Sequence, residues 1–80
     1  MGDLGFLVWQ NDNRGRLDAI RIDASSEQAA AKRWYDAWRS ARSNTTSPAV
    51  VTVECLGNGA RSVWSLRIVD PVLCEPVVPS

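Results

Sequence analysis

The chain has 80 residues, with nine basic and nine acidic side chains, so its formal net charge is zero, and its pI is about 6.1. This length fits one small domain, and the balanced charge argues against a general nucleic-acid-binding domain, whose pI is usually above about 9. With 45% hydrophobic residues, spread along the chain, the composition also excludes disorder and predicts no membrane-spanning segment.

A β-hairpin is predicted for residues 4–24. Residues 4–10 (LGFLVWQ) are an apolar run of strand-forming residues, and residues 16–24 (RLDAIRIDA) alternate in polarity. Between them, residues 11–15 (NDNRG) tolerate the left-handed backbone angles of a hairpin turn. The pattern does not decide which face of the first strand points inward, because both faces carry apolar side chains. These side chains are Leu4, Phe6 and Val8 on one side, and Leu7 and Trp9 on the other.

A helix is predicted to follow the hairpin. Ser25 and Gln28 have the spacing of a capping box, in which the serine oxygen accepts from an unpaired backbone amide. The apolar residues that follow recur at helical intervals and form one stripe: Ala30, Trp34, Ala37, Trp38 and Ala41. We predict that three tryptophans are largely buried and that the helix packs on one face of the sheet. The tryptophans are Trp34, Trp38 and Trp64, and the sheet residues are Ile20, Ile22, Val53 and Leu66.

A second hairpin is predicted after the helix, which cannot continue through Pro48. Its strands are residues 49–56 (AVVTVECL) and 61–69 (RSVWSLRIV), joined by the turn at residues 57–59. The inward side chains are Val51, Val53, Cys55, Trp64, Leu66 and Ile68. Residues 70–80 (DPVLCEPVVPS) contain three prolines, so we predict an extended tail or an edge segment there.

The predicted fold is therefore α+β in the order β-β-α-β-β, with a four-stranded antiparallel sheet and one helix on one face. Residues 1–69 form the domain, and residues 70–80 form a proline-rich C-terminal tail. The second face of such a sheet needs polar residues or a partner, unless the tail folds over it. Its aliphatic and arginine side chains resemble a protein interface. The candidate partner-binding residues are Trp9, Arg14, Arg16, Arg21 and Arg67.

The residue inventory predicts a protein that is not an enzyme. The chain has no histidine, a single lysine (Lys32) and two cysteines without a CxxC pair. Histidine, the commonest general base and the commonest metal ligand, is therefore missing, and two cysteines cannot make a four-ligand zinc site without carboxylate help. We expect no catalytic residue, no metal and no cofactor. Residues 1–9 lack the basic start and long apolar stretch of a signal peptide, which predicts a cytoplasmic protein with reduced cysteines.

The helix opening DASSEQAAAKRW (residues 23–34) between two hairpins resembles small phage-encoded proteins, above all the compact anti-CRISPR proteins that act on type I systems. The resemblance covers residues 4–69. It implies a non-catalytic domain that binds a subunit of the Cascade complex in the cytoplasm of the host bacterium. Such a protein blocks recognition of target DNA. The zero net charge argues against DNA mimicry, so we expect occlusion through protein–protein contacts. The alternative is a small antitoxin-like or nucleic-acid-associated phage regulator.

A homodimer is also expected, because a half-covered sheet and an apolar tail leave a small domain with unburied surface. The two-fold interface would use the open face or the tail. Cys74, on the tail, is then expected to cross-link two chains in air, whereas Cys55 is expected to be protected on an inward strand face.

Overall fold

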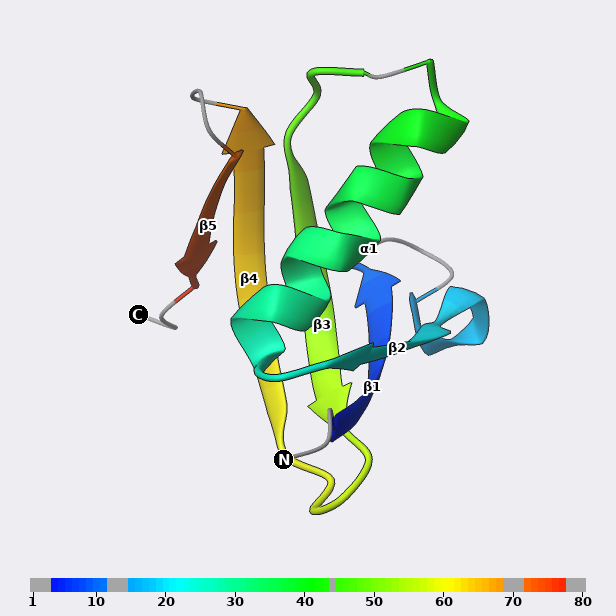
Figure 1. The fold of residues 1–80 in the computed structure, drawn as a ribbon, viewed down its shortest axis with the longest axis vertical. Helices are drawn as coiled ribbons and strands as arrows, with labels where there is room; N and C mark the ends of the chain where they lie inside the picture. The colour runs from blue at the N-terminus through cyan, green and yellow to red at the C-terminus, as the bar shows by residue number, and fades with distance from the viewer. Residues whose placement is uncertain (1–3, 12–14, 44, 69–71, 78–80) are drawn as a thin grey trace.

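The computed structural model describes residues 4–11, 15–43, 45–68 and 72–77. These residues form one antiparallel sheet and one α-helix that lies diagonally across it (Figure 1). The sheet order is β2-β1-β3-β4-β5. The strands are β1 (Leu4–Gln10), β2 (Ile20–Ala24), β3 (Ala49–Cys55), β4 (Arg61–Ile68) and β5 (Val72–Pro76). The helix is α1 (Glu27–Ala41), and a 3-10 turn spans Gly15–Asp18.

The α+β class and the single helix are as predicted, but the sheet has five strands and not four. The additional strand is β5, which pairs antiparallel with β4 and forms one edge of the sheet. An edge position suits Pro76, because proline has no amide hydrogen to donate to a neighbouring strand. The described part of the C-terminal segment therefore extends the sheet and does not fold over its open face.

The first hairpin is confirmed, with Phe6 of β1 opposite Ile22 of β2. Its second strand is shorter than predicted, because residues 15–18 form the 3-10 turn and β2 begins only at Ile20. Phe6 and Val8 are fully buried under α1, which decides the inward face of β1. Register explains the choice, since Phe6 lies opposite Cys55 on the inward face of β3.

The helix begins one residue later than predicted. Its N-cap is Ser26, whose hydroxyl accepts a hydrogen bond from the amide of Ala29 at 3.2 Å. The predicted capping box of Ser25 and Gln28 is therefore wrong. The side chain of Gln28 instead donates from Nε2 to the carbonyl oxygen of Cys74 on β5, at 3.0 Å. A contact distant in sequence thus determines where Gln28 points.

The buried face of α1 is also rotated from the predicted stripe. It consists of Ala30, Ala31, Trp34 and Tyr35. Trp34 is buried as predicted, whereas Trp38 and Trp64 are only partly buried, and Ala37 and Ala41 are exposed. Stacking orders the aromatic side chains, because the Trp38 ring lies 5.7 Å from that of Trp34 and 5.8 Å from that of Tyr35.

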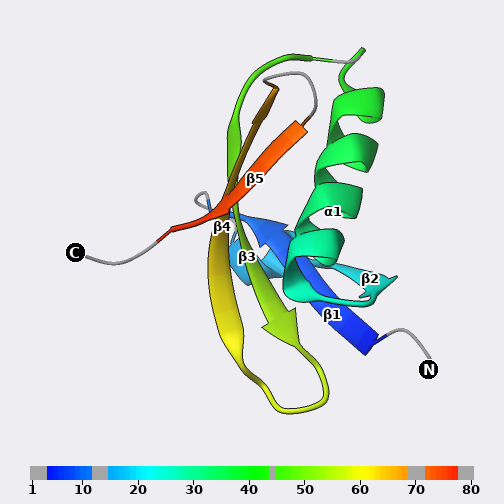
Figure 2. The same ribbon diagram turned by 60° about the vertical axis from the view of Figure 1, so that its left-hand side comes forward.

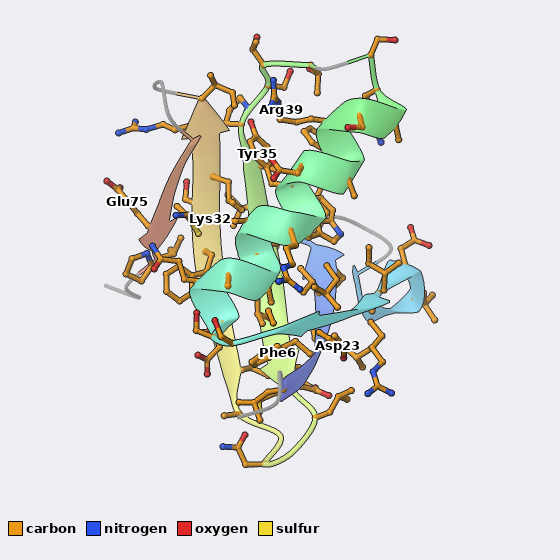
Figure 3. All side chains as sticks on the ribbon, in the orientation of Figure 1. Phe6, Asp23, Lys32, Tyr35, Arg39 and Glu75 are labelled. Carbon is orange, nitrogen blue, oxygen red and sulfur yellow. The ribbon has the colours of Figure 1, made fainter. Side chains whose placement is uncertain are left out.

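Tyr35 is the largest fully buried side chain, and its burial depends on a hydrogen bond. Its hydroxyl donates to the carbonyl oxygen of Ser47 at 2.7 Å, in the segment between α1 and β3. Burial raises the pKa of this hydroxyl above its ordinary value of 10.0, although nearby Arg39 opposes the shift. Figure 3 shows Tyr35 on the side of α1 that faces the sheet, with Arg39 one turn further along.

The core lies between α1 and the inward face of the sheet. The inward residues of β3 are buried as predicted, and on β4 Leu66 is buried while Trp64 and Ile68 pack against the core. Ile20 is an exception to the predicted packing, since it is 45% exposed at the start of the edge strand β2. Among the described residues, no helix is long and apolar enough to cross a membrane.

Both cysteines are free and buried. The predicted exposure of Cys74 is wrong, because Cys74 lies opposite Leu66 on the inward face of the sheet and is 5% exposed. Burial raises the pKa of its thiol above the ordinary value of 9.0, and the charge of Lys32 offsets this only in part. Cys74 is therefore neither accessible nor ionised at neutral pH.

We predict that Ellman's reagent at about pH 8 modifies the native protein much more slowly than the unfolded protein, because only an accessible thiolate attacks the reagent. The absorbance of the released thiolate measures the rate. A Cys55→Ala variant assigns the remaining reaction to Cys74. Rapid labelling of that variant without denaturant would contradict the position of Cys74 in the core.

Candidate functional site

The candidate site is the sheet face opposite α1, which we call the open face. Figure 2 shows α1 along one side of the sheet. The strand register assigns side chains from all five strands to the opposite side. Those described are Leu7, Trp9, Arg21, Asp23, Val50, Thr52, Glu54, Arg61, Val63, Ser65, Arg67 and Glu75.

On each of the two edge strands of the sheet, one backbone carbonyl is already hydrogen-bonded by a side chain of α1. On β2, the carbonyl oxygen of Asp23 accepts a hydrogen bond from Nη1 of Arg33, which reaches it from α1. On β5, the carbonyl oxygen of Cys74 accepts from Gln28, and Pro76 has no amide hydrogen. Short edge strands covered by side chains resist edge-to-edge association. The open face is therefore the better candidate for docking.

Trp9 occupies the centre of the open face but is only 7% exposed. Its neighbour across β3 is Thr52, and Val63 of β4 follows in the same row. The guanidinium of Arg61 lies over the indole, 5.7 Å from the ring centroid, which is a cation–π geometry. A partner approaching this part of the face therefore meets Arg61 above the indole.

Arg61 is held in this position by Glu54. The two residues face each other across the β3–β4 hairpin, and Nε of Arg61 donates to Oε1 of Glu54 at 2.7 Å. The Glu54 side chain is 9% exposed, whereas that of Arg61 is 58% exposed. The acidic partner thus lies in the face, and the guanidinium forms its surface. Sequence reasoning missed Arg61, although the pairing of Glu54 and Arg61 around the turn was a usable signal.

Aliphatic side chains surround this centre. Val50, Leu56 and Val77 are all exposed, and the amide of Val77 donates to the carbonyl oxygen of Val63 at 2.9 Å. Exposed aliphatic side chains near an aromatic–arginine centre are typical of protein-binding surfaces.

The small size of Gly5 leaves room for the side chains of Arg21 and Leu56. A Cβ atom at Gly5 would lie 3.2 Å from Nη2 of Arg21 and 3.3 Å from Cδ1 of Leu56. The absence of a side chain at Gly5 therefore lets Arg21 and Leu56 approach each other across β1.

Three of the five predicted site residues can be placed on the open face. Trp9 is central, and Arg21 and Arg67 are exposed on β2 and β4. Arg21 forms an ion pair with Asp23, with 3.4 Å between Nε and Oδ1. Arg14 lies outside the described residues, as does the side chain of Arg16. The structure thus brings Trp9 together with Arg61, and places Arg21 and Arg67 on either side of β1 and β3.

Comparisons of the chain with protein-family models, with curated proteins and with solved structures find no match. In the part of the chain that the structure describes, no group of three histidine, cysteine or acidic side chains is placed to hold a metal ion.

Proposed function

We propose that this protein is a non-catalytic binding domain that docks on another protein through its open face and needs no cofactor. The observation that carries the proposal is Arg61, which lies over Trp9 and bonds to the buried Glu54. Arginine is enriched among the residues that dominate the binding energy of protein interfaces, and the buried Trp9 supports Arg61 from below. The surrounding aliphatic side chains supply apolar area. The hydrogen bonds from α1 to the edge strands β2 and β5 favour docking through the open face.

We further propose that the protein is an anti-CRISPR protein in the cytoplasm of the host bacterium. Its partner would be a subunit of a type I Cascade complex, and its binding would block recognition of target DNA by occlusion. The resemblance in element order and helix opening supports this identity. The zero net charge supports docking by arginine and apolar contacts over imitation of the DNA backbone.

Purified type I Cascade tests this function directly. We expect the protein to comigrate with Cascade in size-exclusion chromatography. Pre-incubation with the protein should also abolish the shift of a matched DNA duplex by Cascade. Failure to bind complexes of several type I subtypes would contradict the anti-CRISPR function, while leaving open a different protein partner for the open face.

The alternative of a nucleic-acid-associated regulator is supported by the exposed side of α1, where Lys32 and Arg33 lie together with Asp36. Two cations beside a carboxylate give only a weak electrostatic attraction to phosphates at physiological salt. We therefore expect early elution from heparin and no shift of duplex DNA by the protein alone. A clear shift at physiological salt would favour the regulator and not the inhibitor.

The homodimer remains a prediction. Because side chains of α1 bond to both edge strands, the open face is the better interface for it. We expect multi-angle light scattering at high micromolar concentration to give twice the monomer mass of 8.8 kDa. A mass of 8.8 kDa at that concentration would contradict the dimer. Since a dimer through the open face would compete with a partner, the dimer must then dissociate when Cascade binds.

A further inference from the structure

We propose that Arg61 is the anchor of the open face and binds a carboxylate of the partner protein. This inference rests on the proposed binding function and specifies the chemistry of the contact. It also assigns the contact to a residue other than the arginines that the sequence indicated.

The first argument is geometric. A guanidinium can bind acceptors along two edges, and the bond from Nε to Glu54 occupies part of one of them. The Nη1–Nη2 edge can then receive a second carboxylate in the paired geometry that arginine favours. Stacking on Trp9 and the bond to Glu54 together hold the side chain in place. Binding therefore costs less side-chain entropy than it would for a mobile arginine.

The second argument concerns charge. The side chain of Glu54 is nine-tenths buried, whereas that of Arg61 is more than half exposed, so the centre of the open face presents a cation to a partner. A carboxylate complements this cation in both charge and shape. Val63 lies two residues further along β4, and Val77 bonds to Val63 through its backbone. Aliphatic side chains at these positions would exclude water from the contact and strengthen it.

The first test compares Arg61→Lys with the matched variant Arg42→Lys, because Arg42 also lies over an indole, that of Trp38, but at the end of α1 and not on the open face. Lysine keeps the positive charge that Glu54 needs, but it has neither the planar fork nor the stacking surface of arginine. We expect Arg61→Lys to weaken binding to Cascade by about tenfold or more, and Arg42→Lys by about twofold or less. Equal affinities for wild type and Arg61→Lys would overturn the proposal but not the binding function.

The second test needs no Cascade. Hexaglutamate is added to the protein alone at low salt, and the NMR signals of Arg61 Nε–H and the Trp9 indole N–H are followed. In wild type we expect saturable shifts of both signals with hexaglutamate and no such shifts with hexaglutamine. In Arg61→Lys the indole signal of Trp9 should no longer shift. Unchanged signals in wild type, or an equal shift of the Trp9 signal in Arg61→Lys, would overturn the proposal.

These results separate the inference from the function. If Cascade does not bind but hexaglutamate shifts Arg61 and Trp9, the anti-CRISPR function fails and the carboxylate site stands. Light scattering of wild type and of Arg61→Lys is a third measurement. It tests whether a second copy of this chain supplies the carboxylate that binds Arg61. If wild type is a dimer and Arg61→Lys is a monomer, Arg61 also binds a carboxylate of a second copy of this chain in the dimer. If Arg61→Lys then binds Cascade as tightly as wild type does, the assignment to a different partner protein is overturned.

Discussion

Replacing Phe6 with alanine is expected to destabilise the domain by about 3–5 kcal/mol. The Phe6 side chain is fully buried on a central strand, between Ile22 of β2 and Cys55 of β3. A domain of this length is stable by about 4–12 kcal/mol in total, so the loss is a large share of its stability. Urea denaturation, followed by tryptophan fluorescence and far-UV circular dichroism, measures the change in the free energy of unfolding.

Leu4→Ala is the matched control. Leu4 lies on the same strand and the same side as Phe6, but it is 52% exposed, so little apolar area is lost. We expect Leu4→Ala to cost about 1 kcal/mol or less. A similar small loss for Phe6→Ala would show that β1 presents its other face to α1.

The strands could be predicted well wherever one face is apolar and the other is polar. The alternation in β2, β3 and β4 fixed their inward faces, and the two hairpins followed from the turns between them. On β1 both faces are apolar, because the open face carries Leu7 and Trp9. Its orientation therefore depends on pairing with β3, and that neighbour relation is not contained in the local pattern.

The helix shows a different reason for error. Three consecutive alanines and two adjacent serines are compatible with several registers, so spacing alone did not fix the cap or the buried face. The choice depends on two hydrogen bonds distant in sequence. Tyr35 bonds to Ser47, and Gln28 bonds to Cys74. Both contacts occur together with an inward Tyr35 and with Ser26 as the N-cap.

The candidate site was predicted only in outline. Alternation correctly assigned Arg21 and Arg67 to the open face, but Arg61 was missed at the first position of its strand. Its contact with Glu54 follows from the hairpin, whereas its contact with Trp9 requires β1 to lie beside β3. A sequence pattern can therefore indicate which residues share a face, but not which of them meet across strands.

Reversing the charge of Arg67 is expected to weaken binding to Cascade by about 2 kcal/mol or more, which is about thirtyfold. Arg67 is exposed on the open face, so Arg67→Glu should alter the free energy of unfolding by only about 0.5 kcal/mol. Under the proposed function, Arg67→Glu places a carboxylate against an acidic partner surface, which is why we expect the loss of affinity. Isothermal titration calorimetry with Cascade measures the affinity, and circular dichroism checks the fold.

Lys32→Glu is the control for this reversal, because Lys32 is equally an exposed cation but lies on α1, in the other layer of the domain. The Lys32→Glu variant should bind Cascade with the affinity of wild type. Arg21→Glu, at the opposite side of the open face, should weaken binding in the same direction as Arg67→Glu. Higher salt should reduce the difference between wild type and Arg67→Glu, because counterions screen exposed charges. Undiminished affinity in both arginine variants would show that neither Arg67 nor Arg21 lies in the desolvated part of the docking surface, because a reversed charge there would face an acidic partner group.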